Sequence, residues 1–133
     1  MNGMQSQKKE LQTREKDMIL LISGPRKLEV EPELIGELLK ENNLVPDKII
    51  TGGARGIDAC AKEYARSANI EYEALLPIHQ ARWGAIANNR RLAESADILL
   101  AITDGESKGT ADMITRMQNA GKPTFVYVFK NDG

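Results

Sequence analysis

The chain has 133 residues, which is enough for one ordinary domain and too few for two. Its 18 basic and 19 acidic side chains leave a net charge of -1, so it lacks the basic surplus of a strong nucleic-acid binder. A single cysteine excludes an intramolecular disulfide and zinc sites that need several thiolates. A single histidine disfavours His-based metal centres and catalytic triads. We therefore expect no metal and no cofactor.

The apolar runs and the N-terminal segment predict a cytoplasmic protein that does not enter a membrane. Apolar runs extend to about six residues, whereas a membrane span needs about 20. The N-terminus lacks an apolar core of signal-peptide length. Residues 1–17 are mostly charged or polar, and we expect them to form a disordered tail ahead of a single domain over residues 18–130.

The rest of the chain reads as a series of strand and helix units. Residues 18–23 form a continuous apolar run, which is typical of a strand covered on both faces. Pro32 and Asn42 then suit the start and the end of an amphipathic helix. The same unit recurs, with strands expected at 48–51, 72–76, 98–102 and 124–129 and helices expected at 56–68, 83–95 and from Thr110 to Gly121.

This alternation predicts an α/β fold, a Rossmann-like three-layer sandwich of about five parallel strands with helices on both faces. We expect the first strand to be central. In such sheets ligands bind beyond the carboxyl ends of the strands, where the strand order changes direction. The residues of unusual chemistry do follow strands in this sequence, which favours a site at that edge.

The loop after the second strand, Gly52-Gly53-Ala54-Arg55-Gly56-Ile57-Asp58, has features of an anion site. Glycines let the backbone approach a ligand, amides at a helix start attract negative charge, and Arg55 can add a bidentate phosphate contact. A tight strand-to-helix turn with a solvated arginine is the alternative interpretation. The loop lacks the Walker A and dinucleotide spacings, so neither ATP hydrolysis nor a nicotinamide reaction is expected. The candidate ligand-binding residues here are Gly52, Gly53, Arg55, Gly56 and Asp58.

Two other loops that follow strands supply further candidates. The loop after the first strand contributes Ser23, Gly24 and Arg26. The loop after the fourth strand is rich in groups that can hold phosphate or ribose, namely Asp104, Gly105, Ser107, Gly109 and Thr110. The alternative interpretation is helix capping, since Thr110 suits an N-cap.

Arg90 lies beside Asn89 in the third predicted helix, on the same expected face as Ile86 and so close to the buried side. An arginine there needs a partner, because an unpaired buried charge is costly. The partner is either a ligand phosphate or an internal carboxylate, Asp97 or Asp58, and the internal pair is favoured.

Three motifs in chain order are shared with a known group of proteins. They are Gly53-Ala54-Arg55-Gly56-Ile57-Asp58, then Asn89-Arg90-Arg91 ahead of Asp97, then Asp104-Gly105-x-Ser107-Lys108-Gly109-Thr110. Together they resemble the SLOG superfamily, which includes LOG-type phosphoribohydrolases and the Smf/DprA DNA-processing proteins. The likeness covers about residues 18–129 and is greatest to the small, single-domain YspA-like branch, which is often found in bacteria and phages.

The resemblance implies a Rossmann-like fold with a pocket for a nucleotide or a nucleotide-derived ligand, and a helix-mediated homodimer. It implies an anion site at Gly52, Gly53, Arg55 and Gly56 and a second phosphate or ribose contact at Gly109 and Thr110. Arg90 takes the position of the LOG-type catalytic arginine.

One departure from the LOG-type pattern bears on catalysis. Met113 stands where those enzymes carry the glutamate that acts in N-glycosidic cleavage, and Asp112 is one residue early. The preferred hypothesis is therefore a protein that binds or senses a nucleotide without turning it over. The alternatives are an N-glycosidic hydrolase of nucleoside monophosphates, using Arg90 with Asp112 or Glu106, and a single-stranded DNA-binding module. The near-neutral charge weakens the DNA-binding alternative.

Overall fold

The computed structural model describes residues 17–78 and 82–130, with only the backbone given for 82–86. The tail expected at 1–17 lies, apart from Asp17, outside the described residues. The elements are β1 (Ile19–Ser23), α2 (Pro32–Glu41), β2 (Lys48–Thr51), α3 (Ile57–Ser67), β3 (Glu71–Ala74), α4 (Arg82–Ser95), β4 (Ile98–Thr103), α5 (Lys108–Asn119) and β5 (Thr124–Val128).

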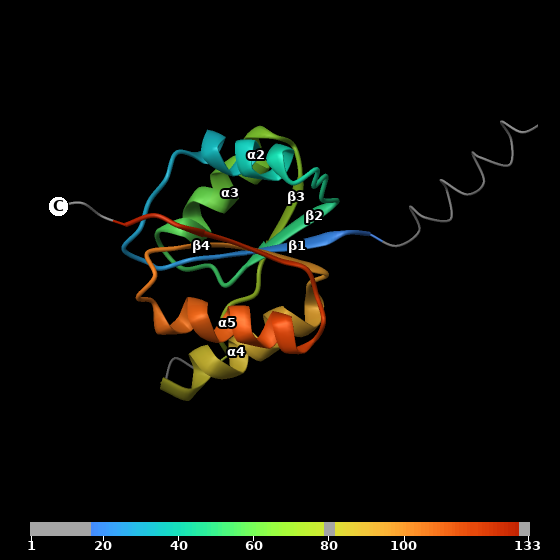
Figure 1. Cartoon of the computed structure of the whole chain (residues 1–133). Coiled ribbons are helices and arrows are strands. Elements are labelled where there is room, and N and C mark those ends of the chain that lie inside the picture. Colours follow the sequence, from blue (N-terminus) through green and yellow to red (C-terminus); the bar gives the residue numbers. More distant parts are fainter. Residues whose placement is uncertain (1–16, 79–81, 131–133) are drawn as a thin grey trace, which may run out of the picture.

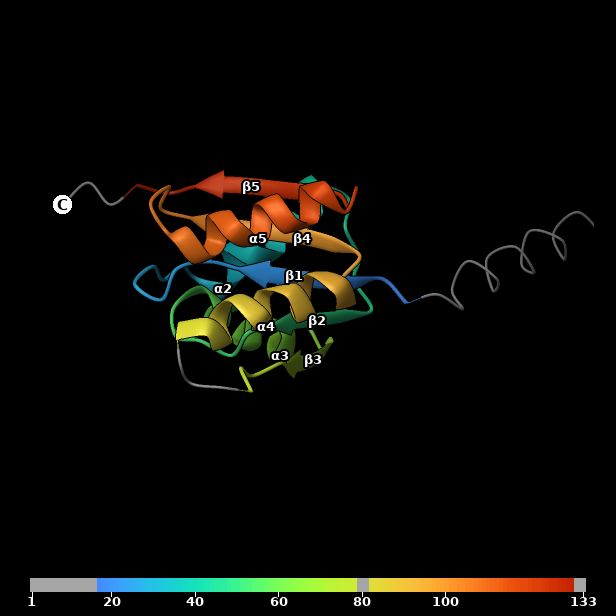
Figure 2. The same cartoon turned by 90° about the horizontal axis from the view of Figure 1, so that it is seen from below.

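The five strands form one parallel sheet in the order β3-β2-β1-β4-β5. Helices α2 and α3 cover one face, and α4 and α5 cover the other (Figures 1 and 2). The predicted α/β, Rossmann-like three-layer fold with a central first strand is confirmed. The strand order changes direction between β1 and β4, because the chain crosses from the β3 edge to the other side of β1 there.

The continuous apolar run of β1 is explained by its two covered faces. Leu20 and Ile22 pack into the cluster under α2 and α3, while Leu21 packs into the cluster under α4 and α5. All three side chains are fully buried. Each stabilises the fold by roughly 1.5–3 kcal/mol through burial of apolar area, so β1 fixes both layers around one strand.

Two predicted boundaries are wrong. The last helix begins at Lys108, and its N-cap is Ser107, whose side chain accepts a hydrogen bond from the amide of Thr110 at 3.3 Å. Thr110 is thus inside the first turn. The third strand ends at Ala74 and not at residue 76, because its partner β2 ends at Thr51, directly opposite Ala74.

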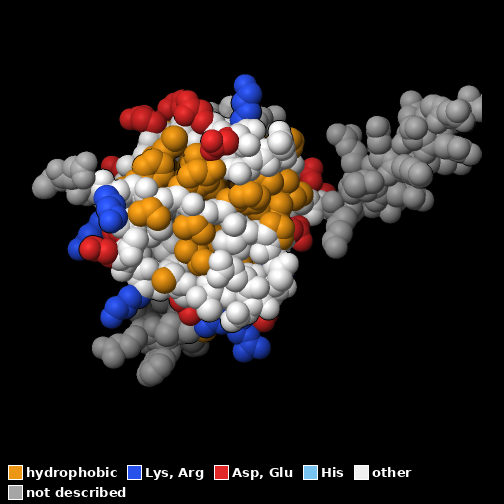
Figure 3. All heavy atoms as spheres, viewed as in Figure 1, with side chains coloured by type: hydrophobic (Ala, Val, Ile, Leu, Met, Phe, Trp, Pro, Cys, Tyr) orange, Lys and Arg blue, Asp and Glu red, His pale blue; other side chains and the backbone are white. Residues whose placement is uncertain are grey.

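The two edges of the sheet differ in character. β3 carries Glu71 and Glu73, which pair with Lys48 of β2. β5 carries Val126 and Val128, which are 41% and 52% exposed, and the space-filling view of this side has many hydrophobic side chains (Figure 3). In the described ranges, none of the helices has the length and apolar character needed to cross a membrane.

Candidate functional site

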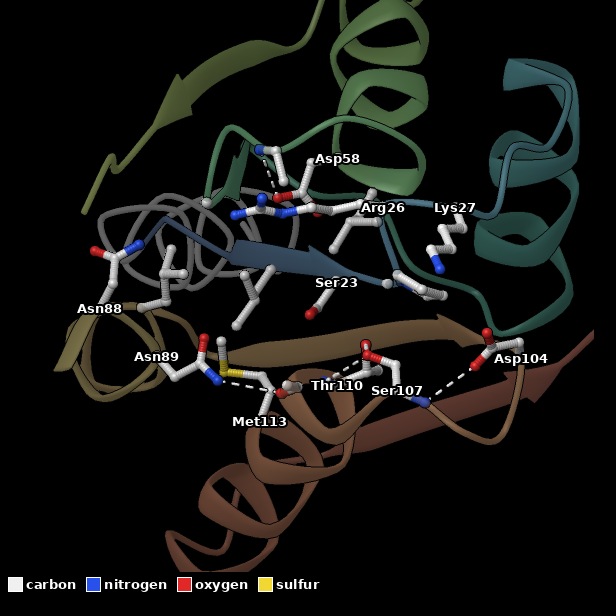
Figure 4. A pocket seen from close by; sticks show the side chains of 18 of the residues that line it. Ser23, Arg26, Lys27, Asp58, Asn88, Asn89, Asp104, Ser107, Thr110 and Met113 are labelled. Carbon is white, nitrogen blue, oxygen red and sulfur yellow. Dashed lines mark hydrogen bonds between the residues drawn. The ribbon is translucent and has the colours of Figure 1, made fainter. Parts of the chain in front are cut away.

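A cleft of about 430 Å³ opens at the carboxyl ends of the strands, beside the point where the strand order changes direction (Figure 4). We call it the switch-point cleft. It gathers ten of the residues predicted from the sequence. The first two loops contribute Ser23, Gly24, Arg26, Gly52 and Asp58. The opposite side contributes Asn89 of α4 and Asp104, Ser107, Gly109 and Thr110 around the start of α5.

The remaining predicted site residues do not line the switch-point cleft. They are Gly53, Arg55, Gly56, Arg90, Gly105 and Asp112. Arg55 is an exposed side chain on the β2–α3 loop. The predicted anion-binding loop therefore lies partly inside the cleft and partly outside it.

The expected burial of Arg90 and its pairing with Asp97 or Asp58 are wrong. The Arg90 side chain is 74% exposed and forms an ion pair with Glu94, one turn along α4, at 3.1 Å. Asn88, Leu92 and Ala93 are buried in this part of α4. Residues two positions away from a buried one point to the opposite side of a helix, which turns Arg90 outward.

Asp112 of α5 forms hydrogen bonds within its own helix and with α4. Its carboxylate accepts hydrogen bonds from Arg116 at 2.8 Å and from Asn89 at 3.0 Å. Burial opposes ionisation, but the hydrogen bonds from Asn89 and Arg116 prevail and lower the pKa of Asp112 below its usual value. Asn89 also donates to the carbonyl of Gly109, so these contacts join α4 to the first turns of α5.

Two predicted glycines allow loops to pack against each other. A Cβ on Gly24 would lie 2.3 Å from the Ile102 carbonyl oxygen, and a Cβ on Gly56 would lie 2.5 Å from the Pro25 carbonyl oxygen. Gly56 also has a φ of 72°, a conformation that side chains disfavour. These glycines bring the β1–α2 and β2–α3 loops together and so form one wall of the cleft.

Two amides of the β2–α3 loop already have acceptors within the chain. The Gly53 amide donates to the Thr51 hydroxyl at 3.1 Å, and the Ala54 amide donates to Asp58 Oδ2 at 3.1 Å. Asp58 is 6% exposed and lines the cleft. The chain's own carboxylate therefore already accepts a hydrogen bond from this glycine-rich loop.

Burial raises the pKa of Asp58 to about 6, because a carboxylate loses solvation inside the protein. The amides of Ala54 and Gly52 and the positive charge of Arg26 act in the opposite direction. Figure 4 shows the Arg26 side chain extending toward Asp58 across the mouth of the cleft. A carboxylate with a raised pKa in a cleft is a typical feature of functional sites.

The start of α5 forms the opposite wall. Asp104 Oδ1 accepts hydrogen bonds from the amides of Glu106 and Ser107, which shapes the loop ahead of the helix. A Cβ on Gly109 would meet no atom within 4 Å, so the first turn is open to approach. The amides of a helix start carry partial positive charge, and a ligand anion is favoured there.

Sequence reasoning missed two polar residues of the cleft. Lys27 adds a second cation beside Arg26. Asn88 donates to the Leu75 carbonyl at 2.8 Å, and its own side-chain oxygen is buried without a hydrogen-bond partner among the described residues. The four-residue spacing of Asn88 and Leu92 was the available signal, since it marks one face of α4.

The lower part of the cleft is apolar. Leu21, Ile22, Leu92 and Met113 contribute to it. Met113 thus lines the cleft at the position where the LOG-type pattern has its glutamate. No group of three metal-ligating side chains occurs within residues 17–78 and 87–130.

No family model matches the chain, and no curated protein matches it. The resemblance to the SLOG superfamily therefore depends on the three sequence motifs.

Proposed function

We propose that the protein binds a nucleotide or a nucleotide-derived ligand in the switch-point cleft. The observation that carries the proposal is the combination of an open helix start, two cations, an apolar wall and a buried acceptor in a single cleft at the carboxyl edge. Its volume of about 430 Å³ falls in the usual range of small-molecule sites, about 300–1,000 Å³.

The start of α5 is the part of the cleft best suited to bind the phosphate end of the ligand. The open first turn at Gly109 exposes backbone with partial positive charge, and Lys27 lines the same cleft. A lysine ammonium strengthens phosphate binding as a mobile point charge. These two features support a phosphate in the part of the cleft next to α5.

The uncharged part of the ligand would pack against the apolar residues of the cleft. Leu92 and Met113 line the cleft from α4 and α5, and both are almost fully buried. A planar base or another apolar group packed beside them would be held mainly by the apolar area of its own that it removes from water. This division into a charged end and an apolar wall matches the chemistry of a nucleotide.

Calorimetric titration with AMP and ADP-ribose tests the proposal. Wild type is expected to bind at least one of them, and Lys27→Glu is expected to weaken binding about tenfold or more by placing a negative charge near the phosphate. Lys62→Glu is the matched control, because it makes the same charge change on an exposed residue of α3 outside the cleft. Equal affinities in both variants, or no binding by wild type, would contradict the proposal.

Arg55→Ala distinguishes this arrangement from an anion site in the β2–α3 loop. Arg55 lies outside the cleft, so its removal is expected to leave the affinity for AMP unchanged. A large loss of affinity would instead favour phosphate binding in the loop.

Incubation with nucleoside monophosphates tests the hydrolase alternative. That alternative uses Arg90 with Asp112 or Glu106, and of these three only Glu106 is a residue of the cleft. We expect no free base to be released. Release that is lost in Arg90→Ala would favour the hydrolase, and salt-sensitive binding of oligonucleotides would favour the DNA-binding alternative.

A further inference from the structure

Asp58 is the charged group of the cleft whose placement the phosphate site does not explain. Its side chain is 6% exposed, and its Oδ2 atom lies 3.4 Å from the Cβ position of Gly52. The amide nitrogen of Asn88 lies 3.6 Å from the same position. Asp58 and Asn88 therefore both lie beside Gly52, and we call this part of the cleft its inner end. Figure 4 shows Asp58 on the opposite side of the cleft from Ser107 and Thr110.

The charge of Asp58 is not needed to hold the β2–α3 loop. The Ala54 amide donates to this carboxylate at 3.1 Å, and the Gly52 amide also favours its ionised form. The carbonyl oxygen of an asparagine could accept the same bond from Ala54. Among the described residues, the ion pairs within 4.0 Å do not include Asp58. A buried carboxylate without a close counter-ion is costly, so a neutral residue would stabilise the fold more.

The same carboxylate opposes phosphate in this part of the cleft. A phosphate at the loop amides would lie next to a negative charge and would compete for an amide that Asp58 already occupies. A carboxylate is a strong acceptor, and a ligand hydroxyl would complete its hydrogen bonding. The inner end thus favours the part of a ligand that donates hydrogen bonds.

We propose that Asp58 determines ligand specificity by accepting hydrogen bonds from the ribose hydroxyl groups of a 5′-nucleotide. The nucleotide lies with its phosphate toward the start of α5 and its ribose toward the start of α3. This inference depends on the proposed function and adds to it an orientation and a preference for ribose. Arg26, which extends toward Asp58 in Figure 4, lies beside the ribose in this orientation.

Calorimetric comparison of AMP with its 2′,3′-dideoxy analogue tests the inference in wild type, in Asp58→Asn and in Glu63→Gln. Wild type should bind AMP about tenfold or more tightly than the analogue, since hydrogen bonds to a charged group are strong. Asp58→Asn should reduce this ratio to near one, mainly by weakening AMP. Glu63→Gln removes one charge from the exposed surface of α3 and should keep the wild-type ratio.

The outcomes separate the two proposals. If wild type binds neither AMP nor its analogue, this inference fails, and the proposed function fails with it when ADP-ribose is not bound either. If wild type binds both equally, or if Asp58→Asn keeps the wild-type ratio, the role of Asp58 is wrong while nucleotide binding stands. Wild type alone decides the first comparison, so the test does not depend on the stability of a variant.

Discussion

At the scale of single residues, Asp58 lowers the stability of the fold near neutral pH. Its carboxyl pKa is raised from an ordinary 3.8 to about 6, with loss of solvation as the main cause. The folded protein therefore holds the proton up to a higher pH than the unfolded chain does. Stability from this group is greatest below about pH 4, decreases as the pH rises to about 6, and is constant above that.

Asp58→Asn tests this effect. The variant should have a free energy of unfolding about 1–3 kcal/mol higher than wild type at pH 7.5, because two pKa units correspond to about 3 kcal/mol. At pH 4 the two proteins should be nearly equal, since the wild-type carboxyl is then mostly protonated. Urea denaturation at both pH values measures the difference. A difference that does not change with pH would contradict the assigned pKa shift.

Two other ionisable side chains interact with Asp58: Arg26, which carries a positive charge, and Tyr72, whose hydroxyl can ionise. Arg26 favours the ionised carboxylate, and burial, with a further contribution from the charge of Asp58, raises the pKa of Tyr72. Tyr72 ionises above the pH range of the test. The difference between the variant and wild type therefore isolates Asp58.

At the scale of elements, the wall of the cleft depends on how closely the loops after β1 and β2 pack. The Gly56 backbone lies against the carbonyl oxygens of Pro25 and Arg26. Gly121, after α5, has nearly the same φ but no atom within 4 Å of its Cβ position. The two glycines share a positive φ, but Gly56 also has a ψ of -127°, and only Gly56 has close neighbours at its Cβ position.

Alanine substitution at these two glycines separates the effects. Gly121→Ala should cost about 1 kcal/mol, which is the ordinary penalty for a side chain in a left-handed conformation. Gly56→Ala should cost clearly more, because its Cβ must also displace the Pro25 and Arg26 backbone. Denaturant unfolding of both variants measures this. Equal losses would show that the close approach of the two loops contributes little.

The helices and strands were easier to predict from the sequence than the side of each helix that faces the sheet. The apolar run of β1 and the positive-φ Gly121 mark their elements through local chemistry alone, and both agree with the structure. The start of α5 was misplaced because Ser107 and Thr110 are both suitable capping residues, three positions apart. The expected face of Arg90 is wrong because it was taken from Ile86, whereas the spacing of Asn88 and Leu92 marks the face of α4 that packs on the sheet.

At the scale of the whole molecule, the sheet order creates the cleft. β1 lies between β2 and β4, so the loops after these three strands meet at one edge, as strand alternation predicts. The glycine-rich loop illustrates what could not be predicted: its amides bond to Thr51 and Asp58 within the chain. Whether a loop amide faces a ligand or the chain's own side chain depends on tertiary packing.

Ligand binding to the folded state should raise the melting temperature. A ligand at 100 times its dissociation constant adds about 2.7 kcal/mol, which for a domain of this size corresponds to a shift on the order of 10 °C. Thermal unfolding with increasing AMP measures the shift. Lys27→Glu should show a smaller shift than Lys62→Glu at the same AMP concentration, whereas equal shifts would indicate that AMP binds elsewhere.

The most direct test of nucleotide binding in the switch-point cleft is a crystal structure of the protein with AMP. We expect density for AMP in the cleft, with the phosphate at the start of α5 near Gly109 and the ribose hydroxyl groups at Asp58. A phosphate in the Gly52–Gly56 loop would contradict the proposed orientation. An empty cleft at a saturating AMP concentration would contradict the central claim.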